Sequence, residues 1–431
     1  GDLPNRGKLI DHKLILDSHP QRAIEKLADG LAAYLTSPSR PWWRPTIDDL
    51  DLMEWGPVKE WLSKVERGMY SVQAGSNFHT AMHADYKEYA SFATSATGLF
   101  EDRRDVMRAR NYTIGEYFVG IGFDGRPNAF GYEYEKTAGQ LVERYGKGNC
   151  SATVQKLAIQ SPDAWVKCIY LCATNPNRDR GQLDNRNMEF VAASWEEGSL
   201  ADTFLEYSGF NEFPYLISRW GVTAQNSYGN ASPGWSILGD SKMLQKLQRD
   251  KLMAIEKVND PPTQQDATVD GKANTLPGGL TRSSALVPNA GVRAAYQINP
   301  DIAATQACIT DTKRAISEGC FENLFMLISQ DERAGRTARE IVERSSERLT
   351  MLGPLVESLY HEKLSPAVSR QFSIMWRAGQ IPPPPPELAG HPINVKLISI
   401  LAQAQEAAGT RAIDETMTFV GEAAKIFPDI L

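Results

Sequence analysis

Several features that identify common classes of protein are missing from this 431-residue chain. No run of residues approaches the roughly 18 apolar positions that a membrane-spanning helix requires. The first residues, GDLPNRGKLIDHK, contain no apolar segment of the secretory kind. The five cysteines are few and odd in number, which disfavours a disulfide framework and favours a reducing compartment. We therefore expect a protein that uses neither a membrane nor disulfide crosslinks.

An excess of positive charge is also missing. The sequence has 46 Lys and Arg residues against 53 Asp and Glu residues, so its formal net charge is −7. Proteins that hold nucleic-acid phosphates tightly are usually basic, and this composition argues mildly against that class. Hydrophobic residues make up 42% of the chain, and its length allows two to four structural regions around a sizeable core.

Sequence motifs of common active sites are absent as well. The chain has no GxxxxGK[ST] phosphate loop, no G-x-S-x-G nucleophile elbow and no GxGxxG segment that opens a helix. Neighbouring acids such as Glu196-Glu197 and Asp331-Glu332 are more typical of solvated surface than of a catalytic pair. We therefore expect no enzymatic activity and no cofactor.

One spacing is compatible with a metal site. His79 and His83 are four residues apart, so a helix would place them on one face, and Asp85 is nearby. Thr80 stands where zinc proteases carry a glutamate, and no third ligand is marked. Ordinary surface or core histidines fit the pattern better, and a metal-dependent hydrolase using His79 and His83 remains an alternative.

The first 235 residues mix helical and strand patterns. Residues 8–67 have helical periodicity, and residues 71–94 could continue it with an interruption at Gly75. Aromatic and β-branched residues around Asp124-Gly125 predict a hairpin. Further elements are expected as strands at 154–159, 164–173 and 188–195, a short helix at 137–145, and an aromatic-rich loop at 201–235.

Two helical patterns then enclose an irregular excursion. Apolar residues recur at helical spacing from 236 to 258, and Pro261-Pro262 ends the pattern. Residues 263–298 contain too many glycines and prolines for a continuous helix. Asn299-Pro300 predicts the cap and first turn of a second helix. Its small residues are compatible with close packing on the first helix, with a ring of identical helices, or with an ordinary buried helix.

A charged loop and a long helix complete the pattern. The loop covers residues 329–336, and the helix runs from 337 to 378 with expected kinks at Gly353-Pro354 and at Pro366. The run Pro382–Pro386 follows as an extended spacer, and residues 395–398 predict a short strand. Ala-rich helical patterns extend from there towards the end of the chain. The predicted fold class is α+β, mainly helical.

Short motifs occur in a fixed order along these elements. They are Phe213-Pro214, Ser218-Arg219-Trp220, Ser227-Tyr228-Gly229, Ser232-Pro233-Gly234, Leu238-Gly239-Asp240, Thr337-Ala338-Arg339-Glu340-Ile341, Leu352-Gly353-Pro354, Leu364-Ser365-Pro366 with Arg370, and Arg377-Ala378-Gly379. Together with the order of the helices, they resemble the portal, or head–tail connector, proteins of short-tailed bacteriophages. The resemblance covers about residues 50 to 420, and its motifs are structural rather than catalytic.

The resemblance implies a portal fold with an α/β wing, a two-helix stem, a clip, a long kinked helix and a short helical crown. On this chain the parts would be the wing at 1–235, the first stem helix at 236–260, the clip at 261–299, the second stem helix at 300–327, the tunnel loop at 328–336, the long kinked wing helix at 337–379, a Pro-rich spacer and wing strand at 380–400, and the crown at 401–431.

A function is implied by the same resemblance. It is a dodecameric ring at one capsid vertex of the virion, assembled in the host cytoplasm, through which double-stranded DNA is packaged and ejected. Implied partners are further copies of the chain, the terminase large subunit, a tail adaptor protein, and the major capsid and scaffolding proteins. A net charge of −7 per copy agrees with a channel in which DNA slides. The alternative is another helical, oligomeric assembly or adaptor protein.

Roles for individual residues follow from this correspondence. The DNA-facing tunnel loop would present Asp331, Glu332, Arg333 and Arg336. Candidates for the stem channel are Lys242, Lys246, Arg249 and Lys251. Candidates for docking at the clip are Lys272, Arg282 and Arg293. Pairing with Asp240, Asp250 or a neighbouring subunit is an equally compatible role for the stem lysines.

Overall fold

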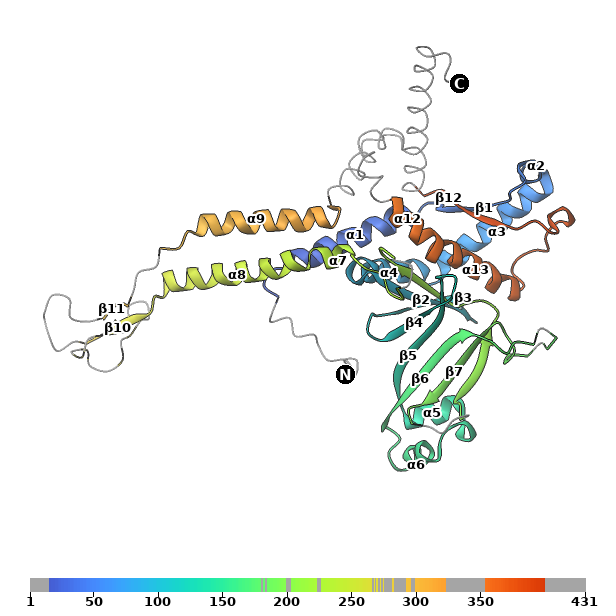
Figure 1. The fold of residues 1–431 in the computed structure, drawn as a ribbon, viewed down its shortest axis with the longest axis horizontal. Helices are drawn as coiled ribbons and strands as arrows, with labels where there is room; N and C mark the ends of the chain where they lie inside the picture. The colour runs from blue at the N-terminus through green and yellow to red at the C-terminus, as the bar shows by residue number, and fades with distance from the viewer. Residues whose placement is uncertain are drawn as a thin grey trace, which may run out of the picture. The chain divides into compact units, whose positions relative to one another are not determined.

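The computed structural model describes residues 15–322 and 353–399, apart from residues 180, 183, 199–202, 223–225, 266, 268, 270–271, 273, 275–280, 283–291 and 296–298. Contacts divide the chain into two units, which we describe separately (Figure 1). The first unit consists of residues 1–4, 24–236 and 320–431, and the second of residues 5–23 and 237–319. None of the described helices is both long and apolar enough to span a membrane.

The first unit combines helices with three antiparallel sheets, which confirms the predicted α+β class. Its helices are α1 (His19–Leu35, which begins in the second unit), α2 (Leu50–Glu54), α3 (Gly56–Gly75), α4 (Phe78–Phe92), α5 (Ala138–Tyr145), α6 (Ala152–Gln160), α7 (Pro233–Ser236), α12 (Gly353–Leu359) and α13 (Ser365–Arg377). The interruption predicted at Gly75 is confirmed, because α3 ends there and α4 begins three residues later.

Two larger sheets form the body of the first unit. One has the order β3-β2-β9, and the other has the order β4-β5-β6-β7-β8. Their strands are β2 (Thr94–Asp102), β3 (Val106–Tyr112), β4 (Tyr117–Ile121), β5 (Pro127–Thr137), β6 (Trp165–Thr174), β7 (Phe190–Glu196), β8 (Glu206–Phe210) and β9 (Tyr215–Arg219). A third sheet pairs β1 (Trp43–Thr46) with β12 (Asn394–Leu397), which confirms the strand expected near residue 395.

Two sequence-based expectations in this unit were wrong. Residues 154–159 were expected to form a strand, but they belong to α6. The Ser151 side chain caps this helix by accepting a hydrogen bond from the Val154 N–H, and Val154 and Leu157 pack into one apolar cluster at helical spacing. The expected loop at 201–235 contains β8, β9 and α7, since Tyr215 and its neighbours on β9 are buried in the sheet.

One buried ion pair to α4 and one partly buried ion pair to β9 hold the segment between α12 and α13 in place. Between α12 and α13 the chain forms a π-helical segment, Tyr360–Leu364, which carries Glu362 and Lys363. Lys363 pairs with Asp85 of α4, and both side chains are almost fully buried. Glu362 accepts a hydrogen bond from Arg219 Nε at 3.0 Å. The helix continues through Pro366, which lies in the first turn of α13 where its missing N–H is not needed.

The second unit is a helical hairpin with a small sheet at its tip. Its elements are α8 (Leu238–Asn259), β10 (Thr263–Gln265), β11 (Val292–Ala294) and α9 (Ile302–Gly319). Helices α8 and α9 lie side by side, and β10 pairs antiparallel with β11 at the tip of the hairpin (Figure 1). The two helices predicted around the excursion are therefore confirmed.

Candidate functional site

The hairpin is held by a narrow apolar contact between α8 and α9. Leu244 of α8 and Ile309 and Ile316 of α9 are almost fully buried. The helices run antiparallel, because Ile237 at the start of the hairpin meets Gly319 at its end, whereas Lys251 meets Gln306 nearer the tip. A Cβ on Gly319 would lie 2.7 Å from Ile237 Cγ2, so glycine is what permits this close approach. Only one side of α8 is therefore used for packing on α9.

Residues at the start of α1 bind both helices of the hairpin. The Asp17 carboxylate accepts a hydrogen bond from Gln248 Nε2 at 2.8 Å and pairs with Lys313 Nζ at 2.7 Å. Burial acts to raise the pKa of Asp17, but hydrogen bonds to Lys313, the His19 N–H and Gln248 outweigh it, so this pKa lies below its ordinary value. Asp17 thus crosslinks α8 to α9 as an anion.

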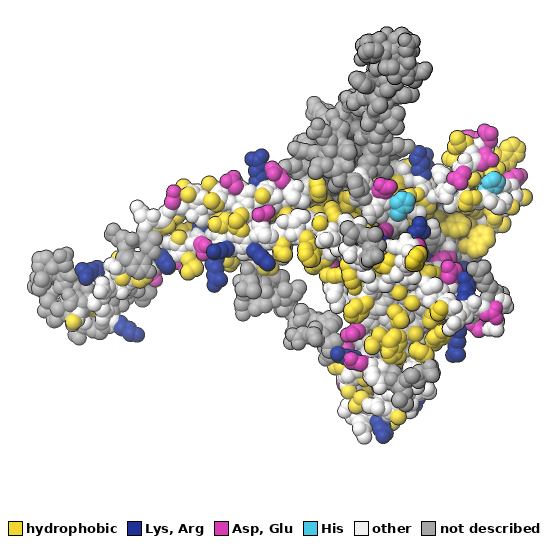
Figure 2. All heavy atoms as spheres, viewed as in Figure 1, with side chains coloured by type: hydrophobic (Ala, Val, Ile, Leu, Met, Phe, Trp, Pro, Cys, Tyr) yellow, Lys and Arg dark blue, Asp and Glu magenta, His cyan; other side chains and the backbone are white. Residues whose placement is uncertain are grey.

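A row of basic side chains lies on the side of α8 that faces away from α9. Successive helical residues are about 100° apart, so Lys242, Lys246 and Arg249 share a face roughly opposite Leu244. All three are exposed, and no ion pair connects them to any described residue. Lys257 lies on the same face, near the tip. We call these four residues the basic row; Lys and Arg side chains gather along this edge of α8 in Figure 2.

The structure separates Lys251 from the other stem candidates. Lys251 is partly buried on the side of α8 that faces α9, where its Nζ donates a 2.6 Å hydrogen bond to Gln306 Oε1. Lys257, in contrast, was missed by the sequence analysis. Helical spacing could have identified it, because Lys257 follows Lys246 by three turns and therefore returns to nearly the same face.

Exposed apolar side chains flank the basic row on both sides. On the helix circumference Leu238 and Leu252 lie to one side of the row, and Met243 lies to the other. Their exposed fractions are 48%, 49% and 47%, respectively. Met253, which is 45% exposed, lies within the row itself. We call the apolar residues on the two sides of the row the apolar strips; they are surfaces of α8 that remain available for packing.

Five small residues lie on the exposed side of α9. They are Ala303, Ala304, Ala307, Cys308 and Ala315. The charged residues on this side include Arg314 and Glu318, which pair with each other at 3.0 Å. Small side chains allow another helix to approach closely. The exposed side of α9, which α8 does not cover, is therefore suited to packing against a further helix.

The candidate docking residues lie at the tip of the hairpin. Lys272, Arg282 and Arg293 are all exposed. Arg293 stands on β11 opposite Gln264 of β10, and the Ala295 N–H donates to the Pro262 carbonyl at 2.7 Å, which closes the base of the tip. The tip thus carries exposed positive charge, with Arg293 on a short two-stranded ribbon. The tunnel-loop candidates Asp331, Glu332, Arg333 and Arg336 lie outside the described residues.

The candidate metal ligands are engaged in other contacts. His79 Nδ1 lies 3.2 Å from the Thr36 carbonyl, and burial lowers the pKa of His79. His83 Nε2 lies 2.7 Å from the Asp29 carboxylate. Asp85 pairs with Lys363. Within the described part of the chain, no group of three or more potential ligands is arranged to hold a metal ion. Nothing in this geometry favours a metal-dependent hydrolase.

Comparison with known proteins identifies relatives over nearly the whole chain. The family model described as bacteriophage head to tail connecting protein matches residues 1–431. A probable portal protein of Bordetella phage BPP-1 is 36% identical over 429 residues, which is 99% of this chain and 77% of the relative. The portal protein of Salmonella phage epsilon15 is 33% identical over 419 residues, which is 97% of this chain and 75% of the relative.

Solved structures with a detectable likeness come from gene transfer agent (GTA) particles. A chain of the virion of a native GTA particle has a TM-score of 0.34 and 11% identity, covering 94% of this chain and 86% of its own. A chain of the neck of an empty GTA particle has a TM-score of 0.36 and 12% identity, covering 91% and 84%. TM-scores and identities as low as these support no conclusion about this chain. The family match and the two phage relatives, however, show that this chain belongs to the bacteriophage head-to-tail connecting, or portal, protein family.

Proposed function

We propose that twelve copies of this chain form a closed ring at one vertex of the phage capsid, with α8 and α9 of every copy forming the wall of a channel for double-stranded DNA. The role is structural, and no step of it requires catalysis by this chain. Assembly takes place in the host cytoplasm, together with the major capsid and scaffolding proteins.

The observation that carries this proposal is the arrangement of side chains around α8. One side packs on α9, the opposite side carries the basic row, and the two remaining sides carry exposed apolar residues. In a ring of identical hairpins, each copy contacts a neighbour on either side through two different surfaces. The apolar residues Leu252 and Met243 would then be buried between neighbours, and the basic row would face the channel.

The charge of the basic row suits a duplex that must move. Exposed lysine and arginine side chains attract phosphates without a fixed geometry, and salt weakens that attraction. With a net charge of −7 per chain, the ring as a whole would not attract DNA strongly. The row would therefore guide the duplex and keep its axis centred, while the remaining surface prevents tight binding.

The tip of the hairpin is the proposed clip. Its exposed Lys272, Arg282 and Arg293 would dock the terminase large subunit during packaging and the tail adaptor protein after packaging. Because both partners would use the same short ribbon, their binding would be mutually exclusive. This gives a physical reason for exchange of one partner for the other.

The ring itself is tested by measuring the mass of the purified full-length particle. The chain mass is 47.8 kDa, and a closed dodecamer has about twelve times that mass. Negative-stain images of the same sample should show a ring with a central opening. Dimers, trimers or open filaments at the same protein concentration would instead support the alternative of another helical assembly or adaptor protein.

The tunnel-loop role is tested separately from the ring. Replacing Arg333 and Arg336 by Ala should reduce packaging or retention of DNA and leave the particle mass unchanged. Packaging of full-length genomes by this variant at the normal level would exclude a role for these two arginines.

A further inference from the structure

One face of the five-stranded sheet in the first unit carries two apolar clusters. Phe130 and Cys172 pair across β5 and β6 and belong to one of them. Cys168, four residues away along β6, belongs to the second cluster, with α5 and α6. Tyr132 and Tyr170 lie between the two clusters and pack against the first, so the middle of this face consists of tyrosine rings.

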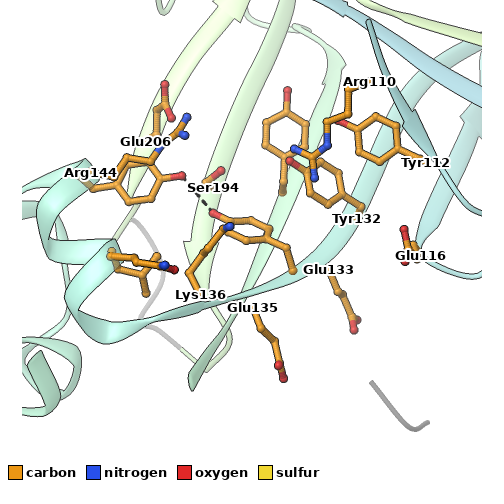
Figure 3. A pocket seen from close by; sticks show the side chains of 15 residues that line it. Arg110, Tyr112, Glu116, Tyr132, Glu133, Glu135, Lys136, Arg144, Ser194 and Glu206 are labelled. Carbon is orange, nitrogen blue, oxygen red and sulfur yellow. Dashed lines mark hydrogen bonds between the residues drawn. The ribbon is translucent and has the colours of Figure 1, made fainter. Parts of the chain in front are cut away.

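A polar row crosses the sheet between the clusters. Strand register places Tyr132 beside Tyr170, Tyr170 beside Ser194, and Ser194 beside Glu206 on four consecutive strands. The Tyr132 and Tyr170 rings lie 5.0 Å apart. This row forms the floor of a cavity of about 570 Å³, which we call the tyrosine groove (Figure 3).

Further tyrosines and basic residues form the walls of the groove. Arg110 and Tyr112 come from β3 on one side, and Tyr134, Lys136 and Arg144 come from the end of β5 and from α5 on the other. An adjoining cavity of about 980 Å³ shares Arg144 and Glu206 and includes Arg186 and Tyr207. The groove thus continues over the edge strand β8.

The side chains that face the groove are predominantly positive. Arg110, Lys136 and Arg144 face it, against the single carboxylate Glu206 in the floor (Figure 3). Glu133 and Glu135 also border the cavity, but they alternate with Tyr132 and Tyr134 along β5 and point to the other side of the sheet. Glu116 lies at the mouth. The interior therefore favours a negatively charged occupant.

Arg110 is held in position without being neutralised. Its guanidinium lies 4.9 Å from the centre of the Tyr112 ring and 5.4 Å from that of the Tyr132 ring. Stacking on two rings restricts the side chain and leaves its N–H donors available in the plane of the group. Within the described residues, no carboxylate pairs with Arg110. Such a preorganised donor is suited to a carboxylate from another molecule.

We propose that the tyrosine groove binds an acidic segment of another protein, with carboxylates on Arg110 and Arg144 and with apolar or aromatic side chains on the tyrosines. Tyr and Arg are the residue types that most often carry the binding energy of protein interfaces. The groove lies in the first unit and is formed by one chain alone, so this inference does not depend on the channel or on the number of subunits.

The test uses the full-length protein and fluorescence anisotropy with labelled ten-residue peptides. One peptide alternates Glu with Tyr, a second alternates Lys with Tyr, and a single-stranded oligothymidylate of ten nucleotides serves as a non-peptide anion. The variant is Arg110→Gln with Arg144→Gln. Its matched control is Arg103→Gln with Lys156→Gln, which removes the same charge from exposed positions of the same unit that do not line the groove.

The Glu-Tyr peptide is expected to bind at least about tenfold more weakly to the groove variant than to the control, and the Lys-Tyr peptide is expected not to bind. Equal binding to variant and control, or no binding of the Glu-Tyr peptide, would overturn the proposal. So would oligothymidylate binding as tightly as the peptide, since the groove would then be a general anion site. Binding by single chains but not by assembled particles would show that a second copy of the chain occupies the groove.

Discussion

The two units of this chain hold charge in different ways. The first unit buries an ion pair, Asp85 with Lys363, beneath its helices. The second unit leaves the basic row of α8 exposed. Both units expose large apolar side chains, such as Phe118 in the first and Leu252 in the second. We propose that the first unit folds around its own core and that the hairpin of the second unit serves assembly.

The largest effect is expected from breaking the buried pair in the first unit. Lys363→Met leaves the Asp85 carboxylate buried without its cation, and such a loss typically lowers the free energy of unfolding by about 3–5 kcal/mol. Adding Asp85→Asn should restore part of that loss. Denaturant titration followed by tryptophan fluorescence measures both variants.

Lys64→Met is the matched control for this experiment. It removes a lysine that pairs with Glu60 across one helical turn, and both side chains of that pair are more than half exposed. Its unfolding midpoint should therefore be nearly unchanged. If the two lysine variants unfold alike, the buried pair does not stabilise the first unit.

A second prediction concerns the apolar strips on α8. Leu252→Glu combined with Met243→Glu places charge at both proposed contacts between neighbours, which should prevent ring closure. The unfolding midpoint of the single chain should change little, because both positions are about half exposed. Particle mass and chemical denaturation are measured on the same preparation. Rings formed by this variant with wild-type mass would show that the strips do not lie between subunits.

A third prediction concerns the basic row. Replacing Lys242, Lys246 and Arg249 by Gln should leave the particle mass unchanged and weaken DNA association, with a shallower dependence on salt concentration. Lys251→Gln serves as the control, since this residue faces α9 rather than the exposed side. The slope of DNA retention against salt is the quantity to compare. A triple variant with the wild-type slope would remove these residues from the DNA path.

The smallest effect on stability is expected from lowering the pH until Asp17 is protonated. The pKa of Asp17 is lowered in the folded chain, so its contribution to stability is fully present above the ordinary value of 3.8 and is lost as the pH falls through the lowered pKa. Asp17→Asn should remove this part of the acid dependence, an effect on the order of 1 kcal/mol. Hydrogen exchange of α8 and α9 amides between pH 5 and pH 2 measures it. An unchanged acid profile in the variant would show that Asp17 does not join the two helices.

Much of the fold could be predicted from local pattern. Helical periodicity together with Pro261-Pro262 and Asn299-Pro300 predicted α8 and α9. The short helix expected at 137–145 is α5, and Thr137 with Gln140 forms its capping box. The error at residues 154–159 has a simple cause. Segment 154–159 is apolar and short, so periodicity alone did not separate helix from strand, and the capping Ser151 decided the outcome.

The sequence predicted which residue types form the candidate site, but not which side of the helix each residue occupies. The sequence indicated basic residues on the first helix of the hairpin, but only the contact between α8 and α9 showed that Lys251 faces inward while Lys242 and Lys246 face outward. The tyrosine groove was not foreseen. Its floor depends on the register of four strands, which brings together residues as distant in sequence as Tyr132 and Glu206.

The most direct test of the account is a density map of the assembled full-length particle at a resolution that shows side chains. The account predicts a closed ring in which Lys242, Lys246 and Arg249 of every copy line the inner wall, and in which Leu252 of one copy lies against the next. A ring whose inner wall is formed by another element, with the basic row on the outside or buried between copies, would contradict it.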